Sequence, residues 1–419
     1  IPHDVFQHSK ILKTKKRIFE FPYAAKSGKV ASKKGVRRFG SPTRRPYGND
    51  TPQRSEDQIK HWGNAVTHET LQDHLERWSE TDSLRQGVAA TVLALAGAGI
   101  AISELIAAGP LAGAMAAVRG YHEDGDSQKE LDVLADQLVM DALRTAPVAV
   151  LGSEELPEPV ALDPRGTLAV AVDPLDGSSN IDINISVGTI FSILPFTGPN
   201  ALLQPGARQL AAGFLVYGPQ VALVLTLGAG THVFILDPAS LRFVKVQDPV
   251  LRNPVFLKVR DSVIVPPETT EYAINGSNAR HWDNAIRYYV EDCQAGAEGP
   301  RGKDFNTRWT ASMVAEAFRI LTRGGVYLYP GDARKGYANG RLRLVYEANP
   351  IAFIMEQARG SATDGRRRIL DIIPSELHQR IPLVFGSRAE VDRIARYHCD
   401  PSQLPERSPL FGRRGLLRA

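Results

Sequence analysis

Cysteine is the scarcest residue of this sequence, with only Cys293 and Cys399 among 419 positions. Two cysteines cannot form the disulfide framework of a small secreted protein, so that class is excluded and a reducing compartment is favoured. We therefore expect a cytoplasmic protein. The hydrophobic content of 43% and the charged content of 23% are typical of a soluble globular chain.

Long apolar runs are also lacking. The longest covers residues 87–102, which is shorter than the roughly 20 residues that a transmembrane helix needs. Ser103 and Glu104 follow it directly, and Pro110 comes soon after. We therefore expect a core helix here, no membrane partner and no signal peptide.

Neither sign of charge dominates the whole sequence, since the net charge is only +4. The charged residues are nevertheless unevenly distributed along the chain. Residues 1–62 hold fifteen Lys and Arg against five Asp and Glu, a net of +10, which leaves −6 for residues 63–419. We expect this basic extension to be disordered. Three interpretations stay open: a targeting leader, an arm for nucleic acid or a membrane surface, or an upstream extension with no role. The acidic body argues against a nucleic-acid partner.

Hydrophobic periodicity predicts a layered α+β and α/β fold with two domains, residues 63–262 and 263–402, followed by a loose basic tail at 403–419. Residues 129–143 show the clearest amphipathic helix. Further helices are expected at 70–78, 87–102, 282–293, 309–322, 347–357 and 388–397. Strands are expected at 148–151, 168–172, 188–194, 210–217, 221–227, 231–236, 261–265, 325–329, 342–345 and 383–385.

The most informative stretch runs Ala-Val-Asp-Pro-Leu-Asp-Gly-Ser-Ser-Asn-Ile-Asp from residue 171 to residue 182. A buried strand is expected to end at Asp173, because Pro174 has no N–H for the ladder. Asp173 and Asp176 at a strand end could hold one hard cation through carboxylate oxygens. The backbone N–H groups of residues 177–179, at a helix start, would suit a phosphate. The alternative is an Asp-rich turn that only caps a helix.

Three further motifs accompany this stretch. They are Gly-Ser-Glu-Glu at 152–155, Gly-Asp-Ser-Gln-Lys-Glu-Leu-Asp-Val-Leu at 125–134, and Arg-Leu-Arg-Leu-Val-Tyr-Glu-Ala-Asn-Pro at 341–350. With them, the chain resembles the class I fructose-1,6-bisphosphatases from about residue 68 to about residue 399. The resemblance implies the sugar phosphatase fold, with αβαβα layers and two subdomains built on mixed sheets.

The resemblance implies a site for two or more Mg²⁺ ions, with Mn²⁺ as an alternative. Its ligands would be Glu154, Glu155, Asp173, the main-chain carbonyl of Leu175, Asp176 and Glu347. Such crowded acids need cations to neutralise them, and the absence of a Cys/His cluster argues against zinc. The implied catalytic residues are Asp132 with Glu155, which would take a proton from the attacking water, and Asp126 nearby.

The resemblance also implies how the substrate is held. The metal-side phosphate would lie on Asp176, Gly177, Ser178 and Ser179. The far phosphate would meet Asn275, Tyr329 and Arg341, together with Arg308 from a neighbouring subunit, so we expect a homo-oligomer, and the family implies a tetramer. Among the residues that depart from the family pattern, two concern the far phosphate. Arg341 stands in place of a usual Lys and would pair with phosphate as a planar fork. Asn278 stands where many members have Tyr, which removes a phenolic donor.

The activity that follows from this resemblance is Mg²⁺-dependent hydrolysis of the 1-phosphate of fructose 1,6-bisphosphate, in gluconeogenesis or the Calvin cycle. Sedoheptulose 1,7-bisphosphate is the first alternative substrate, because a pocket discriminates one carbon unit by only about 1–3 kcal/mol. An inositol-monophosphatase-like enzyme is less favoured, because a monophosphate needs no far-phosphate clamp. Nucleic-acid binding through residues 1–62 is the non-enzymatic alternative.

Overall fold

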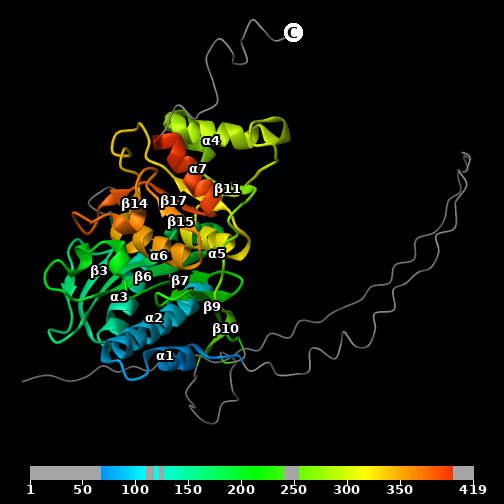
Figure 1. The fold of residues 1–419 in the computed structure, drawn as a ribbon. Helices are drawn as coiled ribbons and strands as arrows, with labels where there is room; N and C mark the ends of the chain where they lie inside the picture. Colours follow the sequence, from blue (N-terminus) through cyan, green and yellow to red (C-terminus); the bar gives the residue numbers. More distant parts are fainter. Residues whose placement is uncertain (1–67, 110–117, 122–126, 239, 241–253, 400–419) are drawn as a thin grey trace, which may run out of the picture. The chain divides into compact units, whose positions relative to one another are not determined.

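The structure is a computed structural model that describes residues 68–109, 118–121, 127–238, 240 and 254–399, and it describes the backbone alone for 118–121 and 127–129 (Figure 1). The expectations for residues 1–62, for the tail at 403–419 and for Asp126 lie outside the described residues. The division at residue 262 into two domains stays a prediction.

The centre of the fold is a mixed sheet in which only β3 and β5 run parallel; its other neighbouring strands are antiparallel. Its strands, in spatial order, are β10 (Phe256–Arg260), β9 (Thr231–Leu236), β8 (Val221–Thr226), β7 (Ala211–Tyr217), β6 (Val187–Pro195), β5 (Leu168–Asp176), β3 (Val148–Ser153) and β4 (Val160–Ala161).

A second mixed sheet is formed later in the chain. Its strands, in order, are β12 (Asn306–Thr307), β11 (Glu271–Ala273), β13 (Val326–Tyr329), β17 (Leu383–Gly386) and β15 (Ser361–Thr363). Two short antiparallel pairs complete the described strands: β1 (Val118–Tyr121) with β2 (Ser127–Lys129), and β14 (Leu342–Arg343) with β16 (Arg380–Ile381).

Helices separate and cover the two sheets (Figure 1). One outer face of the large sheet carries α1 (Leu71–Ser79), α2 (Ser83–Ala108) and α3 (Glu130–Leu143). Helices α5 (Met313–Arg323) and α6 (Asn349–Gln357) lie between the sheets, and α4 (Asn284–Gln294) with α7 (Arg388–Cys399) cover the far side of the second sheet. These αβαβα layers confirm the expected sugar phosphatase fold.

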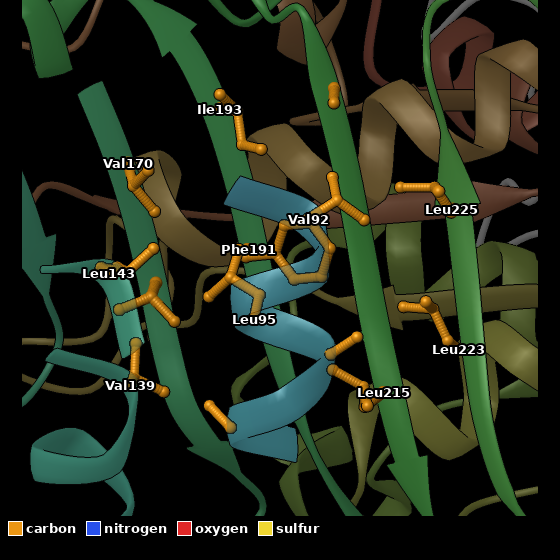
Figure 2. Close-up of a cluster of buried hydrophobic side chains, with 14 of the residues drawn as sticks. Val92, Leu95, Val139, Leu143, Val170, Phe191, Ile193, Leu215, Leu223 and Leu225 are labelled. Atoms are coloured by element: carbon orange, nitrogen blue, oxygen red, sulfur yellow. The ribbon is translucent and has the colours of Figure 1, made fainter. Parts of the chain in front are cut away.

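Strand β7 contributes side chains to two hydrophobic cores, one on each face of the large sheet. Successive side chains of a strand point to opposite faces. Leu215 and Tyr217 therefore pack under the first three helices, whereas Phe214 and Val216 pack against α5 and α6. Figure 2 shows the first of these cores, where side chains of α2 and α3 meet those of β5, β6, β7 and β8. Both faces of the strand are buried, which explains its nearly continuous apolar sequence.

Helix α2 corrects one argument from the sequence. The helix spans 26 residues rather than the expected run of 87–102, so it is long and apolar enough to cross a membrane by length and composition. Its packing decides the question, because Val92, Leu95 and Ile102 are buried against the large sheet and the neighbouring helices. The expected core helix is confirmed, but the length argument for it was wrong.

Two strand predictions were also wrong. Residues 261–265 form no strand; Val263 and Val265 instead donate single backbone hydrogen bonds to Thr231 and Ala358, at 2.8 Å each. Strand β5 does not stop at Asp173 but runs through Pro174 to Asp176. Its pairing with β6 is irregular between Asp173 and Asp176, and a bulge is a place where a strand tolerates proline.

The segment after β14 differs from the expected strand at 342–345. The strand ends at Arg343, and residues Leu344–Ala348 form a turn of π-helix, η9, before α6 begins at Asn349. The Asn349 N–H reaches back to the Leu344 carbonyl, which is the five-residue spacing of a π turn. Glu347 therefore lies within this turn, and the prediction that it opens the following helix was wrong.

Candidate active site

The bulge in β5 places Asp173 and Asp176 on one side of the sheet. Asp173 pairs with Ile190 and Asp176 pairs with Gly188. The chain therefore advances three residues on β5 where it advances two on β6. In a regular strand, residues three apart point to opposite faces, and the one extra residue restores the same face. The bulge is held by Leu175, whose N–H donates to Asp173 Oδ1 at 3.0 Å, and by Thr189, whose hydroxyl donates to the Pro174 carbonyl at 2.7 Å.

The N-terminus of α5 holds the second of these carboxylates. The Val314 N–H donates to Asp176 Oδ2 at 3.0 Å, and Ser312 caps the helix by accepting from the Ala315 N–H at 3.3 Å. A helix N-terminus stabilises negative charge. Burial nevertheless dominates and raises the pKa of Asp176 to about 6, although the N–H donors of Val314 and Met313 oppose the rise.

Glu347, which lies in the π turn, completes the cluster with Asp173 and Asp176. Oxygen atoms of Asp173, Asp176 and Glu347 lie within 4.8 Å of one another, and the three residues are only 2%, 8% and 6% exposed. We call these three residues the acidic centre. Burial raises the pKa of Asp173 and of Glu347 well above the usual range, and the charges of neighbouring acids, Glu154 among them, raise both further.

The donor set of the acidic centre fits a hard divalent cation. Three carboxylates offer only oxygen ligands, which Mg²⁺ and Mn²⁺ prefer and which zinc in a structural site does not. Ionised acids this close and this buried repel one another unless a cation neutralises them. Their raised pKa values express that repulsion together with the burial. The site therefore offers the donor atoms and the negative charge that a divalent cation requires.

Glu154 and Glu155 follow β3 at the edge of the acidic centre, but they are not among the three residues within 4.8 Å. The Glu154 N–H donates to the Val172 carbonyl at 3.1 Å, which fixes this turn beside β5. The Glu155 N–H reaches Ser153 Oγ at 3.3 Å, and that hydroxyl donates to Asp136 at 2.6 Å. Both glutamates line a cavity of about 1110 Å³.

Asp132 is buried near the start of α3, the helix that packs on β3 and β5. It precedes Asp136 by four residues, so both side chains share one face of the helix. Because Asp136 bonds Ser153, this face is turned toward the strand end that carries Glu154 and Glu155. The catalytic role of Asp132 stays a prediction.

Residues 177–179 form the expected tight turn. Gly177 adopts the left-handed conformation at φ 76°, and η4 (Ser178–Ile183) follows as a 3₁₀ helix rather than an α-helix. The side chain of Asn180 donates to the Ala311 carbonyl at 3.0 Å, which ties this turn to the segment before α5. A left-handed residue followed by a helical turn is a backbone arrangement that suits an anion.

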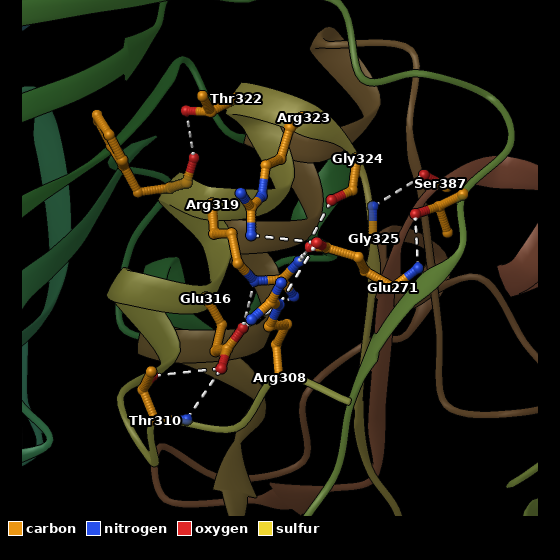
Figure 3. A network of polar contacts seen from close by, with 12 residues as sticks. Glu271, Arg308, Thr310, Glu316, Arg319, Thr322, Arg323, Gly324, Gly325 and Ser387 are labelled. Atoms are coloured by element: carbon orange, nitrogen blue, oxygen red, sulfur yellow. Dashed lines mark hydrogen bonds and ion pairs between the residues drawn. The ribbon is translucent and has the colours of Figure 1, made fainter. Parts of the chain in front are cut away.

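Three of the predicted far-phosphate residues meet in one pocket. Asn275, Tyr329 and Arg341 line it together with Asn278, at the ends of β11 and β13. Arg308 does not line this pocket. It lies in a network around Glu271, whose Oε1 is 3.4 Å from Arg308 Nε, and its side chain is 47% exposed (Figure 3).

Sequence reasoning missed Arg343. Its backbone N–H donates to the Glu347 carboxylate, and its guanidinium lowers the pKa of that acid against the larger effect of burial. Arg343 also lines the large cavity beside Glu154 and Glu155. The signal was present, because Arg343 stands two residues after Arg341 and four residues before Glu347 in the same motif.

The layered fold and the buried acidic centre define a phosphoric monoester hydrolase with the sugar phosphatase fold. Residues 72–248 match the family model described as Fructose-1-6-bisphosphatase, N-terminal domain, and residues 265–399 match that of the C-terminal domain. The chain belongs to the class I fructose-1,6-bisphosphatase family.

Similar proteins agree with this assignment over most of the chain. A class 1 fructose-1,6-bisphosphatase of Azorhizobium caulinodans is 59% identical over 337 residues, 78% of this chain and 99% of that relative. One of Sinorhizobium medicae is 57% identical over 345 residues, 81% of this chain and 95% of the relative. The crystal structure of Leishmania major fructose-1,6-bisphosphatase in holo form has a TM-score of 0.71 at 31% identity, over 80% of this chain and 99% of its own.

Proposed function

We propose that the protein hydrolyses the 1-phosphate of fructose 1,6-bisphosphate to fructose 6-phosphate and phosphate. The observation that carries this proposal is one short segment, residues 341–347, that serves two sites. Arg341 at its start lines the far pocket, and Glu347 at its end belongs to the acidic centre. A substrate with two phosphates can use both, the cation site at one end and the arginine at the other.

Asp173, Asp176 and Glu347 would hold Mg²⁺, with Glu154, Glu155 and the Leu175 carbonyl completing the ligands of two or more ions. Mn²⁺ would fit the same oxygen donors. When bound, the metal would polarise the phosphoryl group and neutralise charge that develops in the transition state. Arg343, beside Glu347, would add a fixed cation of the protein to the same region.

The chain's own residues would then position the substrate and move one proton. Asp132 and Glu155, with Asp126 nearby, would take the proton of the water that attacks phosphorus, which is general-base chemistry. The backbone N–H groups of Gly177, Ser178 and Ser179 would hold the 1-phosphate beside Asp176. Asn275, Tyr329 and Arg341 would hold the far phosphate.

A homotetramer in the cytoplasm is the proposed assembly. Two features support an oligomer. Arg308 is half-exposed and outside its own far pocket, so it could reach the pocket of a second subunit. Helix α2 turns Ala90, Leu93 and Gly97 to solvent, so its outer face is apolar as well. Analytical ultracentrifugation tests this; a monomer at micromolar concentration would contradict it.

Sedoheptulose 1,7-bisphosphate is the second candidate substrate, because the far pocket recognises a phosphate and not the length of the sugar between the two. Steady-state kinetics on both sugars decide it, and equal efficiencies would contradict an exclusive fructose assignment. An inositol-monophosphatase-like activity is disfavoured, because it would leave the far pocket without a ligand.

The experiment that tests the proposal is phosphate release from fructose 1,6-bisphosphate, with and without Mg²⁺, for the wild type and Glu154→Gln. We expect release only with Mg²⁺ and a large loss in the variant. The matched control is Glu158→Gln, an exposed acid of the same loop, which should keep full activity. A folded wild type that releases no phosphate would refute the proposed activity.

A further inference from the structure

The loop of residues 330–340 joins β13 to β14, and its two ends carry Tyr329 and Arg341 of the far pocket. Three residues of the loop itself, Asp332, Arg334 and Tyr337, line the same pocket. Gly336, Ala338 and Asn339 line the large cavity beside Glu154 and Glu155 instead. The loop is therefore a wall between the space next to the acidic centre and the space that would receive the far phosphate.

Two guanidinium groups of this pocket are held against one aromatic ring. The Arg334 guanidinium carbon lies 4.4 Å from the centre of the Tyr337 ring, and that of Arg341 lies 5.1 Å from it. Such contacts fix planar cations over an aromatic face. Tyr337 thus brings a cation of the loop near the cation at the start of β14, although Arg334 and Arg341 are seven positions apart.

Arg334 is also fixed from its other side. Its Nε lies 3.0 Å from each carboxylate oxygen of Asp332, and its Nη2 bonds the same carboxylate. This paired geometry orients the guanidinium plane. Because Asp332 belongs to the same loop, the ion pair does not tie the loop to the rest of the protein and can move with it.

The backbone of the loop has a defined shape. The Asp332 N–H donates to the Tyr337 carbonyl at 3.0 Å, and the Gly340 N–H donates to the same carbonyl at 3.0 Å. The Ala333 N–H donates to the His281 carbonyl at 3.1 Å, which joins the loop to η7 (Gly276–His281), the turn that follows Asn275. The side chains of Arg334 and Tyr337 are therefore presented from an ordered scaffold.

The pocket that these side chains line is narrow. Its free volume is about 10 Å³, room for no more than one water molecule. A phosphate group can enter only if side chains of the lining move aside, and Arg334 and Asp332 can do so as a pair. The charged side chains of the pocket, Asp332, Arg334 and Arg341, sum to +1, so a phosphate dianion needs both arginines to approach neutrality.

We propose that Arg334 and Tyr337 are specificity-determining residues that bind the phosphate remote from the acidic centre, with their side chains moving aside to admit it. Arg334 donates to the phosphate oxygens, and Tyr337 keeps its guanidinium facing that of Arg341. The inference rests on the proposed function for the identity of the substrate, but it concerns a phosphate site that exists whichever sugar lies between.

The first test is equilibrium binding without metal. Trp282 and Trp309 line the pocket, so their fluorescence can follow titrations with fructose 6-phosphate and with inorganic phosphate. We expect Arg334→Ala and Tyr337→Ala to weaken the binding of fructose 6-phosphate by about 10-fold, as for one charge-assisted contact. Lys335→Ala is the matched control, because Lys335 is an exposed cation of the same loop that lies outside the pocket lining. Its affinity should match the wild type.

The second test separates the far phosphate from the rest of the substrate. With Mg²⁺, Arg334→Ala should raise KM for fructose 1,6-bisphosphate by about 10-fold with little change in kcat, and should leave kcat/KM for fructose 1-phosphate unchanged. Equal losses on both substrates, or wild-type binding in the first test, would overturn the inference. If the wild type hydrolyses neither sugar, the proposed activity fails, and the inorganic-phosphate titration still decides the phosphate site.

Discussion

Helix α5 touches two clusters of charged side chains that solve the problem of buried charge in opposite ways. At its N-terminus, Asp176 belongs to the acidic centre, where burial and like charges raise the pKa values of Asp173 and Glu347. One turn further on, Glu316 accepts from Arg319 at 2.9 Å and from the Thr310 N–H at 3.0 Å (Figure 3). The neighbouring Glu271 is paired with Arg308, Arg319 and Arg323.

The difference teaches how a functional cluster can be told from a structural one. In the network around Glu271 and Glu316, arginines outnumber the acids and every acid has a partner of opposite charge. In the acidic centre, three carboxylates are buried together with Glu154 beside them, and Arg343 opposes the charge of Glu347. Uncompensated buried charge is expensive and is kept where it has a chemical use.

The largest effect expected at the acidic centre is kinetic. Asp132→Asn removes the proposed base but no proposed metal ligand, so kcat should fall by about 10²- to 10⁴-fold while Mg²⁺ binding is retained. Phosphate release and calorimetric titration of Mg²⁺ measure the two quantities. A variant with normal turnover would remove the base assignment, and a variant that also loses Mg²⁺ would make Asp132 a ligand instead.

The next effect tests the structural cluster. Glu316→Gln removes one of the two acids that pair with Arg319, and because Glu271 remains its partner, we expect a loss of about 1.5–3 kcal/mol of unfolding free energy. Catalysis should be unchanged below the lowered Tm. Arg323→Ala is the control, because this arginine is half-exposed and an exposed pair contributes less than about 1 kcal/mol. Equal losses in the two variants would remove the distinction between them.

The smallest expected effect has the opposite sign. Asp173→Asn removes one of the crowded charges at nearly constant shape, so the metal-free protein should become more stable above about pH 6 while turnover is lost. Thermal unfolding in a chelator measures the gain. A lower Tm would mean that these carboxylates stabilise the fold as those of the Glu271 network do.

Burial and the crowding of like charges together set the pH dependence. A carboxyl whose pKa is raised in the folded state binds more protons there than in the unfolded chain. Its stabilising contribution is complete below the unfolded pKa and is lost as the pH rises through the folded pKa, which is about 6 for Asp176 and well above the usual range for Asp173 and Glu347. The metal-free Tm should therefore fall as the pH rises through about 6, and Mg²⁺ should restore it.

The sequence predicted the layers well, because helices such as α3 repeat their apolar face within a few residues and β7 is apolar throughout. It could not predict what depends on pairing between distant segments. The bulge that carries β5 past Pro174 is defined only against β6, and the loss of the strand at residues 261–265 depends on partners at Thr231 and Ala358. Arg334 and Tyr337 were missed for the same reason, since only the fold brings their loop to Asn275.

The two irregular backbones of the acidic centre have a common consequence for how such a site can arise or disappear. The bulge before Asp176 and the π turn that contains Glu347 each hold one residue more than the regular element would. The centre is thus encoded by chain length as well as by side-chain identity. An in-frame deletion of one codon between Asp173 and Asp176 would restore a regular ladder and turn one carboxylate to the opposite face. Point substitutions would leave that register unchanged. This part of the site is therefore gained or lost through insertions and deletions.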